Sequence, residues 1–179
     1  TVALPELFGT TGKPATGGYA VSTMLKLCVS KEFTLLAAHE SSPVTDWLRA
    51  LVRKVHAELG GTGVGAIGMC LTGNFALSLA VEPALMAPVL SQPALPLPTS
   101  KERRAALAIS DGDLRTIQKR VTNEGLKVLG LCFTHDSKVP RERFETLRRE
   151  LKQGFEAIEK DVAEFDAKRT SPSGEPIRF

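Results

Sequence analysis

Short apolar runs alternate with amphipathic stretches along most of this chain. The apolar residues 1–5 predict the end of a strand, and runs of small and β-branched residues predict further strands at 63–68, 85–90, 127–133 and 155–159. Helical periodicity predicts helices at 25–38, 44–57, 74–81, 111–121 and 141–151. Because strands alternate with helices, the pattern predicts an α/β fold with a mainly parallel sheet, covered by helices on both faces.

Local signals mark the ends of two of these helices. Serine or aspartate is favoured just before a helix and glycine just after it. One signal is unfavourable: Pro88 lies inside a predicted strand, where proline cannot donate a ladder hydrogen bond. The expected capping residues are Ser41 or Ser42, Gly60, Ser110 or Asp111, and Gly125.

Length and composition indicate an ordinary globular protein. The 179 residues fit a single domain, placed here at 1–165 and followed by a polar C-terminal segment at 166–179. A net charge of +3, with basic and acidic residues intermixed, predicts no nucleic-acid surface. No stretch is long enough to span a membrane. Three cysteines without regular spacing argue against a disulfide framework or a zinc site, so a cytoplasmic location and no bound metal are expected.

The segment Gly68-Met69-Cys70-Leu71-Thr72-Gly73 joins a predicted buried strand to a predicted buried helix. A strand, a glycine-lined turn and a helix, with a thiol at the apex, describe a nucleophile elbow. In such a turn the N–H of the next residue, here Leu71, points at the position of a developing oxyanion. The usual spacing places glycine two residues before and two after the nucleophile. Gly68 fits it, whereas Thr72 occupies the second position.

A buried packing role is the competing interpretation of any cysteine, because cysteine often behaves as a small hydrophobic residue. Cys28 and Cys132 lie inside apolar runs and are expected to be packing residues. Cys70 differs because it lies at the turn itself.

The carboxyl ends of parallel strands meet at one edge of the sheet, where ligands bind. Cys70, Ser91-Gln92 and His135-Asp136 all follow predicted strands and are expected at this edge. A thiol is activated by an imidazole that a carboxylate orients, and Asp136 occupies a suitable place for that acid.

The base is missing from the expected order of nucleophile, acid and histidine. The chain has three histidines, His39, His56 and His135, and none follows Asp136. His135 and Asp136 are adjacent, so their side chains point apart in an extended loop. His56 is expected on a solvated helix surface, and His39 in a loop before the elbow.

These residues resemble the dienelactone hydrolase family of α/β-hydrolases. Segment 68–73 resembles that family's Gly-x-Cys-x-Gly-Gly elbow, 129–140 resembles its acid strand and loop with a Val-Pro pair, and 4–8 resembles an early strand end. The resemblance implies an α/β-hydrolase-like three-layer sandwich. It also implies that Cys70 is the nucleophile, that Asp136 is the acid and that the N–H of Leu71 forms half of the oxyanion hole.

Relative to that family, the sequence lacks the first strands and the histidine after the last strand, so it resembles a chain truncated at both ends. Exposed apolar surface and self-association are therefore expected.

Two functions follow. The first is hydrolysis of a lactone or small carboxylic ester by a cysteine nucleophile, without a cofactor. The second is a non-catalytic α/β-hydrolase-like module for binding or assembly, which the missing histidine favours. A redox-sensing cysteine is a weaker third hypothesis, because no resolving cysteine lies nearby in the sequence.

Overall fold

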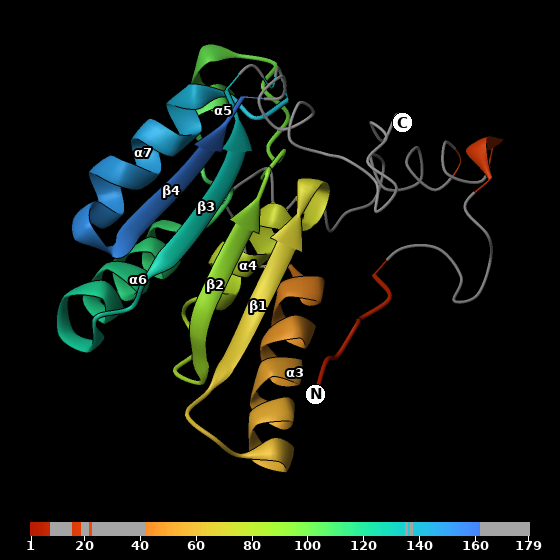
Figure 1. Cartoon of the computed structure of the whole chain (residues 1–179), viewed down its shortest axis with the longest axis vertical. Helices are drawn as coiled ribbons and strands as arrows, with labels where there is room; N and C mark the ends of the chain where they lie inside the picture. The colour runs from red at the N-terminus through yellow and green to blue at the C-terminus, as the bar shows by residue number, and fades with distance from the viewer. Residues whose placement is uncertain (8–15, 19–21, 23–41, 135, 137, 162–179) are drawn as a thin grey trace, which may run out of the picture.

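The computed structural model describes residues 1–7, 16–18, 22, 42–134, 136 and 138–161 (Figure 1). Its strands are β1 (Val64–Met69), β2 (Leu85–Ser91), β3 (Val128–Phe133) and β4 (Phe155–Lys160). Its helices are α3 (Pro43–Leu59), α4 (Gly73–Leu79), α5 (Lys101–Ala105), α6 (Asp111–Glu124) and α7 (Arg141–Leu151). Two 3₁₀ turns, Cys70–Thr72 and Lys152–Gly154, precede α4 and β4.

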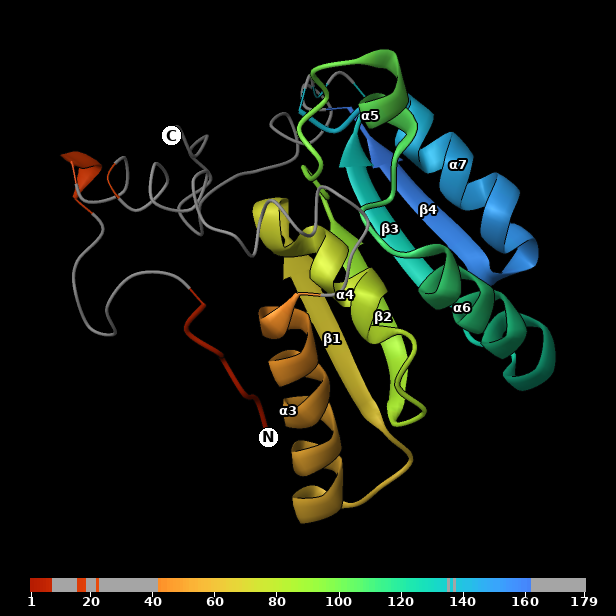
Figure 2. The ribbon, with the colours of Figure 1, turned by 180° about the vertical axis from the view of Figure 1, so that it is seen from behind.

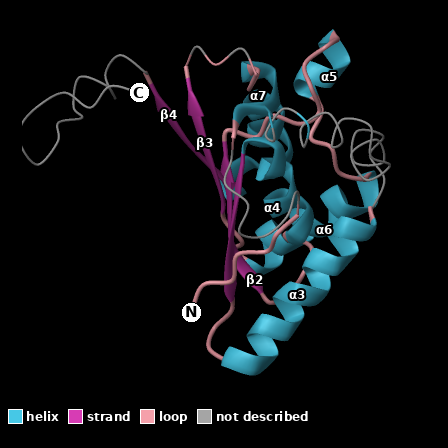
Figure 3. Cartoon of the chain, turned by 90° about the vertical axis from the view of Figure 1, so that its right-hand side faces the viewer, coloured by secondary structure: helices cyan, strands magenta, loops and turns pink. Residues whose placement is uncertain are grey.

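The four strands form one parallel sheet in the order β1-β2-β3-β4. This confirms the predicted α/β class, the parallel sheet and the four strands after residue 60. Each strand is followed in the sheet by its successor in the sequence. Right-handed crossovers that always move in one direction across a sheet place their helices on the same face. The described helices accordingly lie together on one face of the sheet (Figures 2 and 3).

The other face of the sheet carries apolar side chains that the described residues leave uncovered. Ile67 is 73% exposed, Met69 is 61% exposed and Ile158 is 42% exposed. The described helices thus form one layer on one face, and the expected helices on the second face stay a prediction. The sequence showed alternation of strands and helices, but the strand order decides which face each crossover covers. The expected exposed apolar surface is found, while self-association stays a prediction.

The core lies between the sheet and the helical layer. Phe144 of α7 meets Phe155 of β4 edge to face, with ring centroids 5.6 Å apart. Gly130 makes room for them, since a Cβ there would lie 2.6 Å from the Phe155 ring. Fully buried aliphatic residues come from every layer of the fold: Leu77, Leu85, Ile117, Val128 and Leu147.

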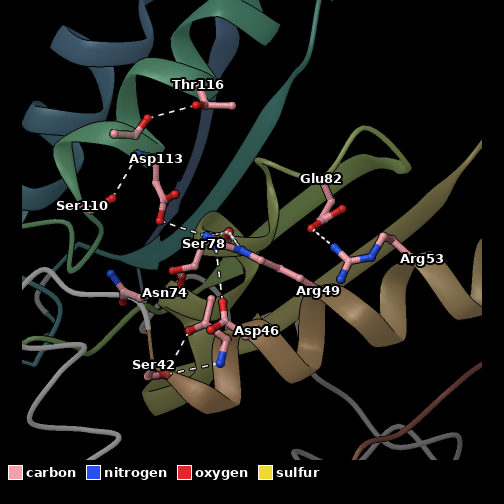
Figure 4. A network of polar contacts seen from close by, with 12 residues as sticks. Ser42, Asp46, Arg49, Arg53, Asn74, Ser78, Glu82, Ser110, Asp113 and Thr116 are labelled. Carbon is pink, nitrogen blue, oxygen red and sulfur yellow. Dashed lines mark hydrogen bonds and ion pairs between the residues drawn. The ribbon is translucent and has the colours of Figure 1, made fainter.

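A polar network fixes the helices relative to one another (Figure 4). Arg49 of α3 donates from Nη2 to the Asp113 carboxylate of α6 at 2.9 Å and to the Ser78 carbonyl of α4 at 3.0 Å. One guanidinium therefore joins three helices. Asn74 of α4 extends the network, because its Nδ2 donates to the Leu107 carbonyl at 2.8 Å.

The predicted caps are confirmed, with Ser42 and Ser110 chosen over their neighbours. The Ser42 hydroxyl accepts the Thr45 N–H, and the Ser110 hydroxyl accepts the Asp113 N–H. Gly125 ends α6 at a φ of 70°, which suits glycine. Pro88 lies within β2, but pairing with β3 begins only at Val89.

The N-terminal prediction was wrong. Residues 1–7 form neither strand nor helix, and the Val2 and Leu4 side chains are 81% and 90% exposed. An apolar run forms a strand only where a neighbouring strand can pair with it, and no described strand lies beside this segment. The predicted helix at 25–38 and the polar segment at 166–179 lie outside the described residues. The described residues between 42 and 161 share one sheet and one core, while the boundary at 165 stays a prediction.

Candidate functional site

The carboxyl ends of β1, β2 and β3 lie at one edge of the sheet, toward which the arrowheads point in Figure 1. Met69 pairs in register with Ser91, and Ser91 pairs with Leu131. Cys70 follows the first of these strands directly, and Asp136 follows the third after a short loop. The predicted placement of these residues at a common edge is confirmed. Their chemical roles stay predictions.

Cys70 has the backbone conformation of a residue held at a sharp turn. It begins the 3₁₀ turn with a φ of 52°, and its side chain is exposed. A positive φ is uncommon for a residue other than glycine and persists only where the surroundings enforce it. Such strained residues cluster at functional sites. The thiol is thus presented outward at the end of β1 rather than packed within the strand.

Two glycines make this turn possible. A Cβ on Gly68 would lie 2.2 Å from the Thr72 carbonyl oxygen, and a Cβ on Gly73 would lie 2.6 Å from the Pro93 Cα. Neither position accepts a larger residue without movement of the backbone. The second required glycine is therefore Gly73, because the start of α4 packs directly against the loop that follows β2.

Thr72 has a structural part in the turn. Its Oγ1 accepts the Met69 N–H at 2.9 Å and donates to the Met69 carbonyl at 2.8 Å. The threonine therefore closes the turn that the usual glycine would only permit. Leu71, the second residue of the same turn, is half-buried, and an N–H at that position has no partner within its own helical turn.

The loop after β3 holds Asp136 in a tight turn. Asp136 Oδ1 accepts the Lys138 N–H at 2.8 Å, and the Asp136 carbonyl accepts the Val139 N–H at 3.3 Å. A carboxylate that bonds a backbone N–H two residues later forms an Asx turn. The side chain is half-buried and fixed in orientation. Asp136 therefore stabilises the conformation of its own loop, whether or not it also has a catalytic role.

The described residues bring no histidine to Cys70. His56 lines a cavity of about 360 Å³ with Thr62 and Ala84, which lie just before β1 and β2, at the opposite edge of the sheet. His56 is half-buried rather than solvated as expected, and its Nδ1 has no hydrogen-bond partner. His39 and His135 lie outside the described residues.

Cys132 confirms its expected packing role. It lies in β3, half-buried and packed against the core. Burial is the largest cause that raises the pKa of its thiol to about 11, and the nearby Glu159 carboxylate adds to the shift. Such a thiol stays protonated near neutral pH and is a poor nucleophile. Cys28 lies outside the described residues.

Sequence reasoning missed the loop that supports the elbow. This loop runs from Gln92 to the start of α6 and contains α5. The Ala94 N–H donates to the Cys70 carbonyl at 3.0 Å, and Arg143 of α7 donates to the Pro93 carbonyl at 2.6 Å. Neither contact has a local signal, because the partners lie 24 and 50 residues apart in the sequence.

A second cavity, of about 270 Å³, lies between residues 6–7 and the start of α3 and does not include Cys70. Within the part of the chain that the structure describes, groups of three or more potential metal-binding side chains are absent. None of the described helices combines the length and the apolar character needed to cross a membrane.

Comparison of the chain with protein-family models, with curated proteins and with solved structures finds no match.

Proposed function

We propose that this protein is a hydrolase of the dienelactone hydrolase type, which cleaves a lactone or small carboxylic ester through Cys70. The backbone of Cys70 carries the proposal. Its φ of 52° lies at a turn between β1 and α4 that leaves no space for a Cβ at Gly68 or Gly73. A thiol that only filled space would need neither this strain nor this exposure.

In the proposed reaction, the Cys70 thiolate adds to the carbonyl carbon of the substrate. The resulting oxyanion accepts a hydrogen bond from the Leu71 N–H, and collapse expels the alkoxide to leave a thioester on Cys70. Water then attacks the thioester and releases the acid and the thiol. Asp136 orients the base that moves these protons, and that base comes from outside the described residues. The reaction needs no cofactor and no metal.

The fold proposal is finer than the observed arrangement. We infer an α/β-hydrolase-like three-layer sandwich, in which the uncovered sheet face receives a second layer. The exposed apolar side chains Ile67, Met69 and Ile158 support this inference, because a stable sheet buries such residues. A cytoplasmic location also stays a proposal.

Hydrolysis of p-nitrophenyl acetate tests the proposed nucleophile. We expect Cys70→Ala to reduce kcat/KM by at least about 100-fold, because the proposed thioester forms on the Cys70 thiol. Cys132→Ala is the matched control, since it removes a thiol of the same sheet that is half-buried and has a raised pKa. It should retain most of the activity. Intact mass spectrometry should detect an acetyl adduct on wild type and on Cys132→Ala, but not on Cys70→Ala.

A non-catalytic assembly module is the second candidate, and two observations favour it. The uncovered sheet face suits contact with another surface, and the described residues place no histidine near Cys70. If wild type and Cys70→Ala hydrolyse the ester equally and no acetyl adduct forms, the hydrolase proposal is wrong. The assembly function would then be the better interpretation.

A further inference from the structure

Arg143 is a fully buried cation, and within the described part of the chain every hydrogen bond of its side chain goes to a backbone carbonyl. It lies in the first turn of α7 and has no exposed surface. All of its carbonyl partners come from the loop between β2 and α6. Nε donates to Ala106 at 3.0 Å, Nη1 to Pro93 at 2.6 Å, and Nη2 to Pro96 at 2.5 Å and to Arg103 at 3.1 Å.

This arrangement costs free energy that must be offset elsewhere. Removal from water lowers the pKa of the Arg143 guanidinium to about 10. Within the described residues no carboxylate forms an ion pair with it, since the neighbouring Glu142 pairs with Arg104. A buried charge without an acid is tolerated only where its hydrogen bonds are well satisfied. The four carbonyls supply them, and the guanidinium in turn fixes the loop.

The fixed loop touches the elbow at two points. The Ala94 N–H donates to the Cys70 carbonyl at 3.0 Å. Pro93 lies against Gly73, where even a methyl group would not fit. One of the Arg143 hydrogen bonds ends on the Pro93 carbonyl itself. The path from Arg143 to the Cys70 backbone therefore passes through two adjacent residues.

We propose that Arg143 is a positioning residue for Cys70: it holds the Pro93–Ala94 segment against the elbow and so keeps Cys70 at its positive φ. This inference rests on the proposed hydrolase function for its kinetic consequence, but not for its structural one. A strained φ persists only where surrounding contacts over-determine it. The Pro93–Ala94 segment supplies two such contacts, one to the Cys70 carbonyl and one to Gly73, from outside β1 and α4.

Arg120 is a matched control within the same chain. Its side chain is only 4% exposed and likewise binds four backbone carbonyls, those of Ala80, Glu82, Pro83 and Leu85. Three of these carbonyls belong to the turn between α4 and β2 and the fourth to the first residue of β2, at the opposite edge of the sheet from Cys70. Arg120 thus has similar burial and the same type of carbonyl partners, but it also pairs with Glu124 and does not bind the loop beside the elbow.

The test compares Arg143→Lys with Arg120→Lys. Lysine keeps the positive charge but cannot donate to several carbonyls through a planar fork. We expect both variants to lose stability in urea unfolding. Arg143→Lys should also lower kcat for p-nitrophenyl acetate by about 10- to 100-fold with KM within about twofold, because the nucleophile is misplaced while substrate contacts remain. Arg120→Lys should change kcat by less than about threefold.

Alkylation of Cys70 separates this inference from the proposed function. Peptide mapping measures the rate at which iodoacetamide modifies Cys70 at pH values between 6 and 10. This measurement does not require hydrolase activity. We expect the alkylation rate of Cys70 in Arg143→Lys to differ from that of wild type by at least about threefold. The rate in Arg120→Lys should match wild type. Equal effects of the two variants, or none from Arg143→Lys, would overturn the positioning role. If wild type does not hydrolyse the ester but the two arginine variants still differ in the alkylation rate of Cys70, only the hydrolase proposal would be overturned.

Ala94→Pro provides a second approach if Arg143→Lys does not fold. It removes the N–H that bonds the Cys70 carbonyl while the Arg143 hydrogen bonds remain. The same change in alkylation profile is expected. An unchanged Cys70 profile in this variant would mean that the loop does not brace the elbow, and the proposal would fail.

Discussion

Arg143 and Arg120 hold the backbone at opposite edges of the same sheet. Each is buried and donates to four backbone carbonyls in or directly next to one connecting segment. They differ in two respects. Arg120 also pairs with the Glu124 carboxylate at 2.7 Å, whereas Arg143 has no such acid among the described residues. Arg120 fixes a turn of a few residues between α4 and β2, whereas Arg143 fixes a loop of more than ten residues between β2 and α6.

The difference shows where each edge obtains its order. A short turn is almost determined by the helix and strand that it joins, so the Arg120 hydrogen bonds mainly satisfy carbonyls. A long loop has no ladder to satisfy its carbonyls and needs an internal partner to adopt one conformation. At the carboxyl edge that partner also fixes the surroundings of Cys70. The carboxyl edge is thus organised by contacts from distant parts of the chain.

The largest expected effect removes each guanidinium completely. Arg143→Met and Arg120→Met should each lower the free energy of unfolding by at least about 3 kcal/mol, because several buried carbonyls lose their donors. Urea unfolding measures both. Similar losses would show that the two guanidinium groups stabilise the fold to the same extent. A loss below about 1 kcal/mol in either variant would show that water replaces that guanidinium, and the two regions would no longer be equivalent.

A methyl group at the elbow should have the next largest effect. Gly68→Ala should lower the free energy of unfolding by about 3 kcal/mol, because its Cβ meets the Thr72 carbonyl oxygen. Gly65→Ala is the matched control on the same strand. Its Cβ would have ordinary contacts, the nearest at 3.6 Å, and stability should stay within about 0.5 kcal/mol. Equal tolerance at both positions would mean that the elbow is not tightly built.

Ser110→Ala tests whether the carboxyl edge loosens as a unit. The Ser110 hydroxyl accepts the Asp113 N–H at 3.1 Å, so its loss should cost about 1 kcal/mol. The Cys70 alkylation rate should not change, because the cap lies beyond the carbonyls that Arg143 binds. Ser110→Asn should retain most of the stability. A slower Cys70 reaction in Ser110→Ala would show that any weakening of this edge reaches the elbow.

The smallest effect concerns the second thiol near this edge. Burial raises the pKa of Cys132 from 9.0 to about 11, so the folded state favours the neutral thiol. The resulting stability is complete below about pH 9 and is lost as the pH rises through 11. Cys132→Ala should therefore lose less stability between pH 8 and 10.5 than wild type does. Cys70→Ala is the control. If the free energy of unfolding depends on pH in the same way in Cys132→Ala and wild type, Cys132 is not the group that causes this loss of stability.

Much of the architecture could be predicted from local patterns. The β-branched run at 63–68 and the serine and glycine caps of α3 and α6 are local features, and each formed the expected element. The apolar residues at 1–5 led to a wrong strand prediction, because a strand needs a neighbouring strand to pair with, and the sequence pattern does not show one. Pro88 was expected to be unfavourable, yet β2 tolerates it because pairing with β3 starts one residue later.

The candidate site divides in the same way. Cys70 was identifiable because a cysteine at a strand–helix junction between glycines is a local signal. The role of Gly73 in place of the usual glycine was not, because it depends on Pro93, 20 residues later. Arg143 carried no signal at all. An arginine in an amphipathic helix normally indicates a solvated surface, and only the packed loop shows that it is buried.

The sequence by itself determined the alternation of strands and helices, the helix caps and the turn that presents Cys70, because each depends on residues a few positions apart. The tertiary structure alone decided that the described helices share one face, that Ile67 and Met69 remain uncovered, and that Arg143 reaches the loop beside the elbow. These features depend on strand order and on contacts between distant residues. Neighbouring residues in the sequence give no sign of such contacts, because they form only when the sheet and its helices pack together.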